Sequence, residues 1–263
     1  AFCRRKYGRN AIGPFIISMT QGADDILSVL LLAQWGELHN RRGDVPLDVA
    51  PLLETVDDLH SGPEILEALL STELYREHLE RRGNRQTVMI GYSDSNKDGG
   101  LAAARWALQN AQETLVNVVE SQGIELTLFH GRGGTVSRGG SKTHTAVLGA
   151  PPGTVNGRLR VTEQGEIINE KHGLRGIALR TLEQTMGSVA LATAMPTHRG
   201  NDMPEWHDMM NVIAEESRRA YRKLVYKTPG CYDYFRTATP IDVIERMRIG
   251  SRPSARRSQA GVE

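Results

Sequence analysis

The sequence has few cysteines, no long apolar run and almost no net charge, and each shortage narrows the class of protein. Its two cysteines, Cys3 and Cys231, are too few for a disulfide framework and are not spaced as metal ligands, so a cytoplasmic location fits. No apolar run approaches the roughly 20 residues of a membrane-spanning helix, and we expect no membrane partner. The formal net charge of +1 favours neither the presence nor the absence of a nucleic-acid partner.

What is present is the composition of an ordinary globular protein, 39% hydrophobic and 24% charged over 263 residues. No internal repeat, low-complexity tract or obvious linker divides the chain, so we treat residues 1–263 as a single domain. The chain begins at Ala1 without Met, carries no signal-peptide pattern and stops without a visible closing element. We therefore expect a section of a longer chain, and hence an incomplete domain.

Strand-like and helix-like segments alternate along the first half of the chain, which predicts an α/β fold. This alternation is typical of βα units around a parallel sheet. The expected strands are residues 14–19, 47–55, 86–92 and 124–132, and the expected helices are residues 23–36, 62–83 in two pieces, and 101–123. Residues 131–158 are Gly-rich and predicted as loop, residues 158–166 are a candidate strand, and the chain from about Ile177 is predicted as mostly helical.

The stretch YSDSNKDGG, residues 92–100, begins like the calcium loop of an EF-hand when it is read from Asp94. The closing position of such a loop needs a bidentate Glu, and here it is Arg105. A strand rather than a helix is predicted before it, so we reject the calcium loop. Two interpretations remain: a functional site at the end of a strand, or a turn in which Asp94 or Asp98 is the N-cap of the next helix.

A second unusual segment, FHGRGGTVSRGGSK at residues 129–142, is rich in glycine and basic residues. No Asp or Glu occurs from residue 126 to residue 161, whereas five basic residues of interest do: Arg132, Arg138, Lys142, Arg158 and Arg160. Glycines let backbone N–H groups approach an anion, and arginines supply forked donors for phosphate or carboxylate, so an anion site is one interpretation. A plain surface loop and RNA binding through RGG triplets are the alternatives.

Taken together, several segments resemble the phosphoenolpyruvate carboxylase family, in the order and spacing of that family. The matching segments are AIGPFIISMTQGADDILSVLLLAQWG, APLLETVDDL, VMIGYSDSNKDGG, ELTLFHGRGGTVSRGG, LRVTEQGEII, YFRTATP and GSRPSARR. The resemblance implies a (β/α)8-type barrel, incomplete here, with many additional helices, in a homotetramer. Because the family enzymes are much longer, an upstream catalytic histidine, another substrate-binding arginine and a downstream helical region are expected to be absent.

The resemblance also implies a reaction and a metal ion. Family members join phosphoenolpyruvate and bicarbonate to give oxaloacetate and phosphate, through carboxyphosphate and a metal-bound enolate, and so feed the tricarboxylic acid cycle. Glu54 and Asp94 match the metal ligands of the family, and both follow predicted strands. Two carboxylates with water and substrate oxygens suit Mg²⁺ or Mn²⁺.

Five further residues take their expected roles from the resemblance alone. Arg132 and Arg252 match phosphate-binding arginines of the family, and Arg138 matches a catalytic arginine on a mobile loop that an aspartate or malate effector draws away. Lys97 and His130 match positions with supporting catalytic roles. Ser137 stands where the family usually has glycine, which bears on regulation more than on chemistry.

Two hypotheses about this chain therefore stay open. In the first, the parent protein is an active carboxylase and the 263-residue chain alone is inactive, because an incomplete barrel leaves unpaired strand edges and lacks the upstream histidine. In the second, the chain is a catalytically silent fragment that binds anions or RNA through its Gly- and Arg-rich loop.

Overall fold

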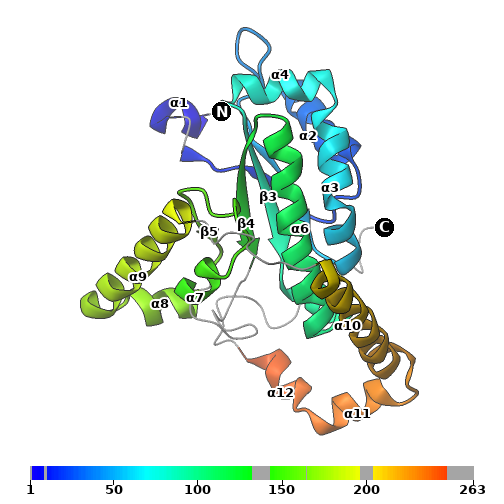
Figure 1. Ribbon diagram of the computed structural model, residues 1–263. Helices are drawn as coiled ribbons and strands as arrows, with labels where there is room; N and C mark the ends of the chain where they lie inside the picture. The colour runs from blue at the N-terminus through cyan, green and yellow to red at the C-terminus, as the bar shows by residue number, and fades with distance from the viewer. Residues whose placement is uncertain (1, 9–10, 132–142, 164, 196–203, 248–263) are drawn as a thin grey trace.

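The computed structural model describes residues 2–8, 11–131, 143–163, 165–195 and 204–247, and its centre is a parallel sheet (Figure 1). The strands lie in sequence order, and every neighbouring pair is parallel. They are β1 (Phe15–Ile17), β2 (Val49–Leu53), β3 (Arg85–Gly91), β4 (Glu125–Gly131) and β5 (Arg160–Val161). The predicted α/β alternation and its first four strands are confirmed.

Helices connect the consecutive strands and cover one face of the sheet (Figure 1). They are α2 (Ala23–Trp35), α3 (Val56–Leu70), α4 (Glu73–Arg81), α5 (Ser93–Gly99) and α6 (Leu101–Ser121), and a short α1 (Phe2–Tyr7) precedes them. The predicted break between α3 and α4 is confirmed. Since parallel strands need such crossovers, the order of the strands follows directly from the order of the segments.

The start of α3 fixes the chain where β2 ends. Thr55 Oγ1 accepts a hydrogen bond from Asp58 N at 3.0 Å, and the Asp58 carboxylate accepts from Thr55 N at 2.9 Å. The same carboxylate oxygen accepts from Glu54 N at 3.1 Å. This reciprocal capping box satisfies donors that the helix cannot pair internally, and it holds the backbone of Glu54 in place.

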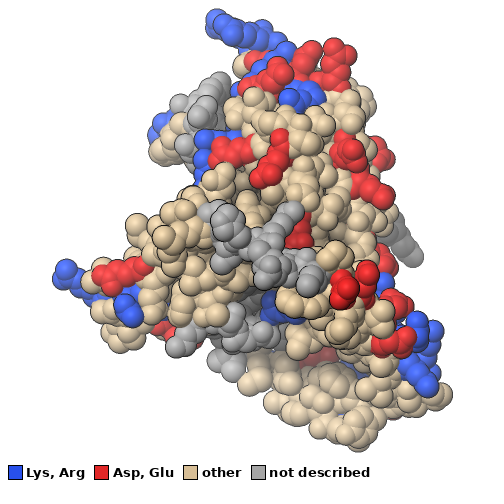
Figure 2. Space-filling model, viewed as in Figure 1, with Lys and Arg blue, Asp and Glu red and all other residues tan. Residues whose placement is uncertain are grey.

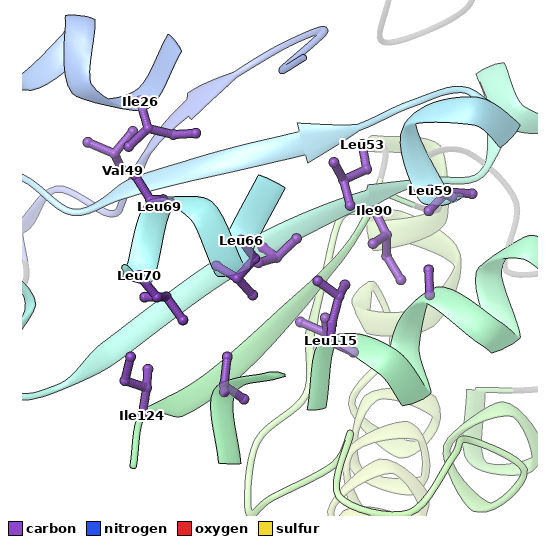
Figure 3. Close-up of a cluster of buried hydrophobic side chains, with 14 of the residues drawn as sticks. Ile26, Val49, Leu53, Leu59, Leu66, Leu69, Leu70, Ile90, Leu115 and Ile124 are labelled. Atoms are coloured by element: carbon purple, nitrogen blue, oxygen red, sulfur yellow. The ribbon is translucent and has the colours of Figure 1, made fainter. Parts of the chain in front are cut away.

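The core lies between the sheet and this layer of helices. Figure 3 shows Leu53 and Ile90 from the strands pointing toward Leu59 and Leu66 of α3 and toward Leu115 of α6. Leu59, Ile90 and Leu115 are fully buried, and each such side chain contributes roughly 1.5–3 kcal/mol relative to exposure. Side chains at alternate strand positions, such as Thr87, Met89 and Phe129, face the opposite side and are only partly buried.

The second half of the chain is helical. Its elements are α7 (Thr143–Leu148), α8 (Gly165–His172), α9 (Arg175–Ala194), α10 (Pro204–Arg222), a π-helical turn η2 (Lys223–Lys227), α11 (Cys231–Ala238) and α12 (Ile241–Arg246). Helix α10 packs against α5 and α6, and α9 packs against α7 and α8 (Figure 1). Among the described residues, none of the helices has the length and apolar content needed to cross a bilayer.

Large apolar side chains remain exposed on the C-terminal helices. Met186 of α9, Trp206 of α10 and Tyr234 of α11 are 71%, 56% and 74% exposed. Figure 2 shows that the charged side chains on this face gather over the upper part of the molecule and the outer ends of α9 and α10, whereas the surface at α11 and α12 is mainly uncharged.

The structure corrects two predictions about the middle of the chain. Residues 131–158 were predicted as loop, but residues 143–148 form α7, in which Val147 is buried. The many glycines on either side concealed this short helix. The candidate strand at residues 158–166 is reduced to β5, because α8 already begins at Gly165. The five strands form an open parallel sheet in a helix-rich α/β fold. A closed (β/α)8-type barrel stays a prediction.

The buried His78 makes the stability of the fold dependent on pH. Burial, and then the positive charge of Arg82, lowers the pKa of His78 below its ordinary value of 6.5. The unfolded chain therefore binds more protons below about pH 6.5, so the stabilisation present above that pH is lost as the pH falls. We expect the thermal midpoint to drop between pH 8 and pH 5, and to drop less in His78→Gln. His39→Gln, at an exposed position, should behave as the wild type, and equal drops in all three proteins would contradict the assignment.

Candidate metal and anion site

The carboxyl ends of the parallel strands bring one layer of residues to the same edge and face of the sheet. Leu53 is paired with Ile90, Gly91 with Gly131, and His130 with Val161. The next residues along β2 and β5 are Glu54 and Thr162, so the layer is Glu54, Gly91, Gly131 and Thr162. In α/β proteins this edge is where ligands bind.

The two glycines in this layer let the neighbouring strand ends pack closely beside Glu54. A Cβ atom on Gly91 would lie 3.1 Å from the Cα atom of Glu54 and 3.2 Å from the carbonyl oxygen of Leu53. A Cβ atom on Gly131 would lie 3.0 Å from the carbonyl oxygen of Ile90. Side chains at these two positions would crowd the backbone, so the Glu54 carboxylate lies beside two positions that favour glycine.

The Glu54 side chain is half-buried and is held from the end of β1. Its Oε2 atom accepts a hydrogen bond from Met19 N at 3.2 Å. Met19 has a φ angle of 54°, in the left-handed region that costs a residue with a side chain roughly 1–2 kcal/mol. Backbone conformations of this kind concentrate at functional sites, and here the strained turn directs an N–H group at the carboxylate.

Asp94 lies in the first turn of α5, directly after β3. The alternative that Asp94 or Asp98 caps the following helix is wrong, because residues 93–99 form a helix of their own and Gly100 is the N-cap of α6. The Asp94 carboxylate pairs with Lys97 Nζ at 3.2 Å. The side chains of Asp94 and Lys97 are 43% and 70% exposed, so both are accessible to a ligand.

The residues present fit a hard divalent cation. Glu54 and Asp94 follow neighbouring strands and offer carboxylate oxygens at the same edge of the sheet. Within the described ranges the protein has no group of three or more His, Cys, Asp and Glu side chains that could hold a metal ion. Mg²⁺ does not need such a cage, because it commonly binds through one or two carboxylates and takes its other ligands from water and substrate.

His130 lies on the other side of the sheet from this layer. It shares the helix-facing side of β4 with Leu128, is 7% exposed, and its Nδ1 atom lies 2.8 Å from the Tyr92 hydroxyl. Both side chains line a cavity of about 310 Å³ that Arg105 of α6 and Thr162 also border. This hydrogen-bonded pair joins the ends of β3 and β4, and the sequence carried no signal for it because the two residues are 38 positions apart.

The basic residues singled out in the sequence do not all lie together. Arg158 pairs with Glu125, at the amino end of β4, and so lies at the opposite end of the strand from Gly131. Arg160 lies 4.5 Å over the centre of the Phe129 ring, one layer below Thr162. The predicted site residues Arg132, Arg138 and Arg252, together with Lys142, lie outside the described residues.

Comparison with known proteins identifies the class to which this sheet and carboxylate site belong. The family described as phosphoenolpyruvate carboxylase matches residues 1–263. A phosphoenolpyruvate carboxylase of Xanthomonas oryzae pv. oryzae (strain MAFF 311018) is 51% identical over 259 residues, covering 98% of this chain and 28% of the relative. Those of Mycobacterium leprae (strain TN) and Vibrio vulnificus (strain YJ016) are 44% and 45% identical over 260 and 255 residues, each covering 97% of this chain and 28% of the relative.

The chain therefore belongs to the phosphoenolpyruvate carboxylase family, as the sequence motifs indicated. It spans 28% of the length of the curated relatives it matches. Because the chain belongs to this family, the layer that contains Glu54 is a candidate metal site.

The close packing beside Glu54 can be tested by adding a side chain at Gly91. In Gly91→Ala the new methyl group would press on the backbone of Glu54, so we expect a loss of about 1–3 kcal/mol in stability and weaker Mn²⁺ binding. The matched control is Gly187→Ala, since the position in α9 has open space around it and should be neutral or slightly stabilised. Thermal unfolding and Mn²⁺ titration measure both effects, and identical behaviour of the two variants would contradict the crowding.

Proposed function

We propose that the protein containing this chain joins phosphoenolpyruvate and bicarbonate to give oxaloacetate and phosphate. The observation that carries this proposal is the placement of Glu54 and Asp94 after neighbouring strands, in a chain that matches the carboxylase family throughout. A site of this kind suits a reaction whose substrates and products are all anions.

Glu54 and Asp94 would hold the metal ion, Mg²⁺ or Mn²⁺. When bound, the ion supplies a positive charge that stabilises the negative charge developing on the enolate. The residues of the chain fix its position: the hydrogen bond from Met19 N orients the Glu54 carboxylate, and Lys97 orients Asp94. Orientation of this kind matters because the groups must be in place before the charge develops.

The reaction has two steps that both transfer anionic groups. A bicarbonate oxygen attacks phosphorus, the bond from phosphorus to the enol oxygen breaks, and carboxyphosphate and the enolate of pyruvate are formed. Carboxyphosphate then breaks down to phosphate and CO₂, and the enolate carbon attacks CO₂ to give oxaloacetate. Lys97 places its positive charge beside Asp94, and we assign it a role in holding the anionic reactants. Arg132 and Arg252 would bind phosphate, and Arg138 would assist the transfer.

His130 receives a supporting role at most in this proposal. Its ring is buried on the helix-facing side and bound to the Tyr92 hydroxyl. It would keep β4 and the segment that follows Gly131 in position relative to β3. A role in direct proton transfer would require the ring to reach the layer of Glu54, on the other face of the sheet.

The proposal includes a barrel, and the side chain of Arg160 supports it. A Cβ atom on Gly13, two residues before β1, would lie 2.9 Å from an Arg160 Nη2 atom of β5. The Arg160 side chain therefore reaches from the last strand to the segment that precedes the first, as expected when a sheet curls toward closure. The rest of a (β/α)8-type barrel would cover the face of the sheet opposite the helices. A homotetramer, an aspartate or malate effector and a cytoplasmic location belong to the same proposal.

Oxaloacetate formation tests the proposal in the full-length protein. With phosphoenolpyruvate, bicarbonate and Mg²⁺, we expect turnover that can be followed as NADH loss through malate dehydrogenase. Glu54→Gln and Asp94→Asn should each lower kcat/KM by about 10²–10³ or more, because each removes charge that holds the cation. Glu67→Gln, an exposed carboxylate on α3, is the matched control and should keep wild-type activity.

The same experiment separates the carboxylase from a silent binding fragment. Absence of metal- and bicarbonate-dependent turnover in a folded full-length protein would contradict the carboxylase proposal. Salt-sensitive retention of RNA with no response to phosphoenolpyruvate would then favour binding through the Gly- and Arg-rich loop.

A further inference from the structure

Asp98, four residues after the proposed metal ligand Asp94, joins three separate elements. Its Oδ2 atom accepts hydrogen bonds from Val56 N, at the start of α3, at 3.3 Å and from Arg218 Nη2 of α10 at 3.1 Å. Its Oδ1 atom accepts from Arg222 Nη1, also of α10. The Asp98 side chain is 18% exposed, so these contacts are shielded from water and depend on one another.

The backbone at the end of α5 is held by the same region. Tyr226 of the π-helical turn η2 donates its hydroxyl to the carbonyl oxygen of Lys97 at 2.7 Å, and Arg222 donates to the carbonyl oxygen of Asp98 at 3.1 Å. The last carbonyl groups of a helix have no partner within the helix. A helix of seven residues is also too short to be stable by itself, so α5 depends on these external donors.

Two glycines allow α3 and α10 to come close to the end of α5. A Cβ atom on Gly100 would lie 2.9 Å from Cγ of Tyr221, and its φ angle of +78° disfavours any side chain. A Cβ atom on Gly99 would lie 2.8 Å from the Val56 side chain. We call Asp98, Arg218, Arg222 and Tyr226 the Asp98 network. It forms between segments more than 100 positions apart.

We propose that Asp98 is a positioning residue for the metal site: the Asp98 network fixes α5 against α3 and α10, and thereby sets the places of Asp94 and Lys97. The inference rests on the proposed function, because it takes Asp94 as a metal ligand. Asp98 does not touch the substrate. It acts through the orientation of the helix, and residues that orient metal ligands typically change metal affinity by about 10–100-fold when they are replaced.

Asp57 provides a matched control within the same contact. Arg218 also binds Asp57, with Nη1–Oδ1 and Nη2–Oδ2 distances of 2.9 and 3.0 Å, and this hydrogen bond lowers the pKa of Asp57 below its ordinary value. Asp57 lies on α3, and its side chain is 72% exposed. Replacing it removes a partner of Arg218 but leaves the bonds to Asp98 available.

The test is Mn²⁺ binding to the full-length protein, measured from the electron paramagnetic resonance signal of free Mn²⁺. Asp98→Asn should weaken Mn²⁺ binding about tenfold, raise the KM for the metal in parallel, and lower kcat at saturating Mn²⁺ by less. Asp57→Asn should keep the wild-type affinity. Wild-type affinity in Asp98→Asn, or an unchanged affinity with a loss confined to kcat, would overturn the proposal.

A second variant covers the case in which Asp98→Asn does not fold. Tyr226→Phe removes one exposed hydroxyl donor to the Lys97 carbonyl group, and should weaken Mn²⁺ binding about threefold, as expected for one hydrogen bond. An unchanged affinity would then count against the network.

Failure of the proposed function would be visible in the wild type, which would show neither Mn²⁺ binding nor turnover. The hold of Asp98 on α5 is tested independently of the metal by hydrogen exchange of the Gly100 amide, which donates to the carbonyl oxygen of Asn96 at the end of α5. Faster exchange in Asp98→Asn than in Asp57→Asn would support it, and equal exchange would overturn it.

Discussion

The parallel pairing of β2, β3 and β4 is the constraint on which the site depends. Because the register sets Leu53 beside Ile90 and Gly91 beside Gly131, the residues that follow each strand arrive at one edge. Glu54 and Asp94, 40 positions apart in the sequence, are thereby brought to neighbouring strand ends. The register itself is held by the buried layer of leucine, isoleucine and valine under α3 and α6, since a slip of one residue would expose that layer.

The two carboxylates are held in different ways: Glu54 by local contacts and by the adjacent strand end, and Asp94 by contacts between distant segments. Glu54 is fixed by its neighbours in sequence, through the capping box of Thr55 and Asp58, and by Met19 from the adjacent strand end. Asp94 sits on a short helix whose carbonyl groups and Asp98 side chain are bound from the distant α10. A change in the placement of α10 would therefore act on Asp94 through α5, and on the start of α3, next to Glu54, through Asp57 and Val56.

The sequence predicted those features that depend on periodicity and on local motifs. Alternation of apolar strands and amphipathic helices identified the parallel sheet, and the resemblance of the motifs to the carboxylase family singled out Glu54 and Asp94, whose role as metal ligands stays a prediction. It could not predict the Tyr92–His130 hydrogen bond or the contacts of Asp98 with Arg218, because such pairs depend on packing between segments far apart. It also misread residues 93–99 and 143–148, where polar or glycine-rich surroundings conceal short helices that tertiary contacts stabilise.

The separation between Asp98 and its α10 partners has a consequence for the order of assembly. Each neighbouring pair of strands is joined by a short crossover, so β1 to β4 can pair as the chain leaves the ribosome. Arg218 and Arg222 lie 120 and 124 positions beyond Asp98, so the chain between them must be synthesised before the bonds close. The bonds that support α5 therefore close only after the chain as far as Arg222 has been synthesised.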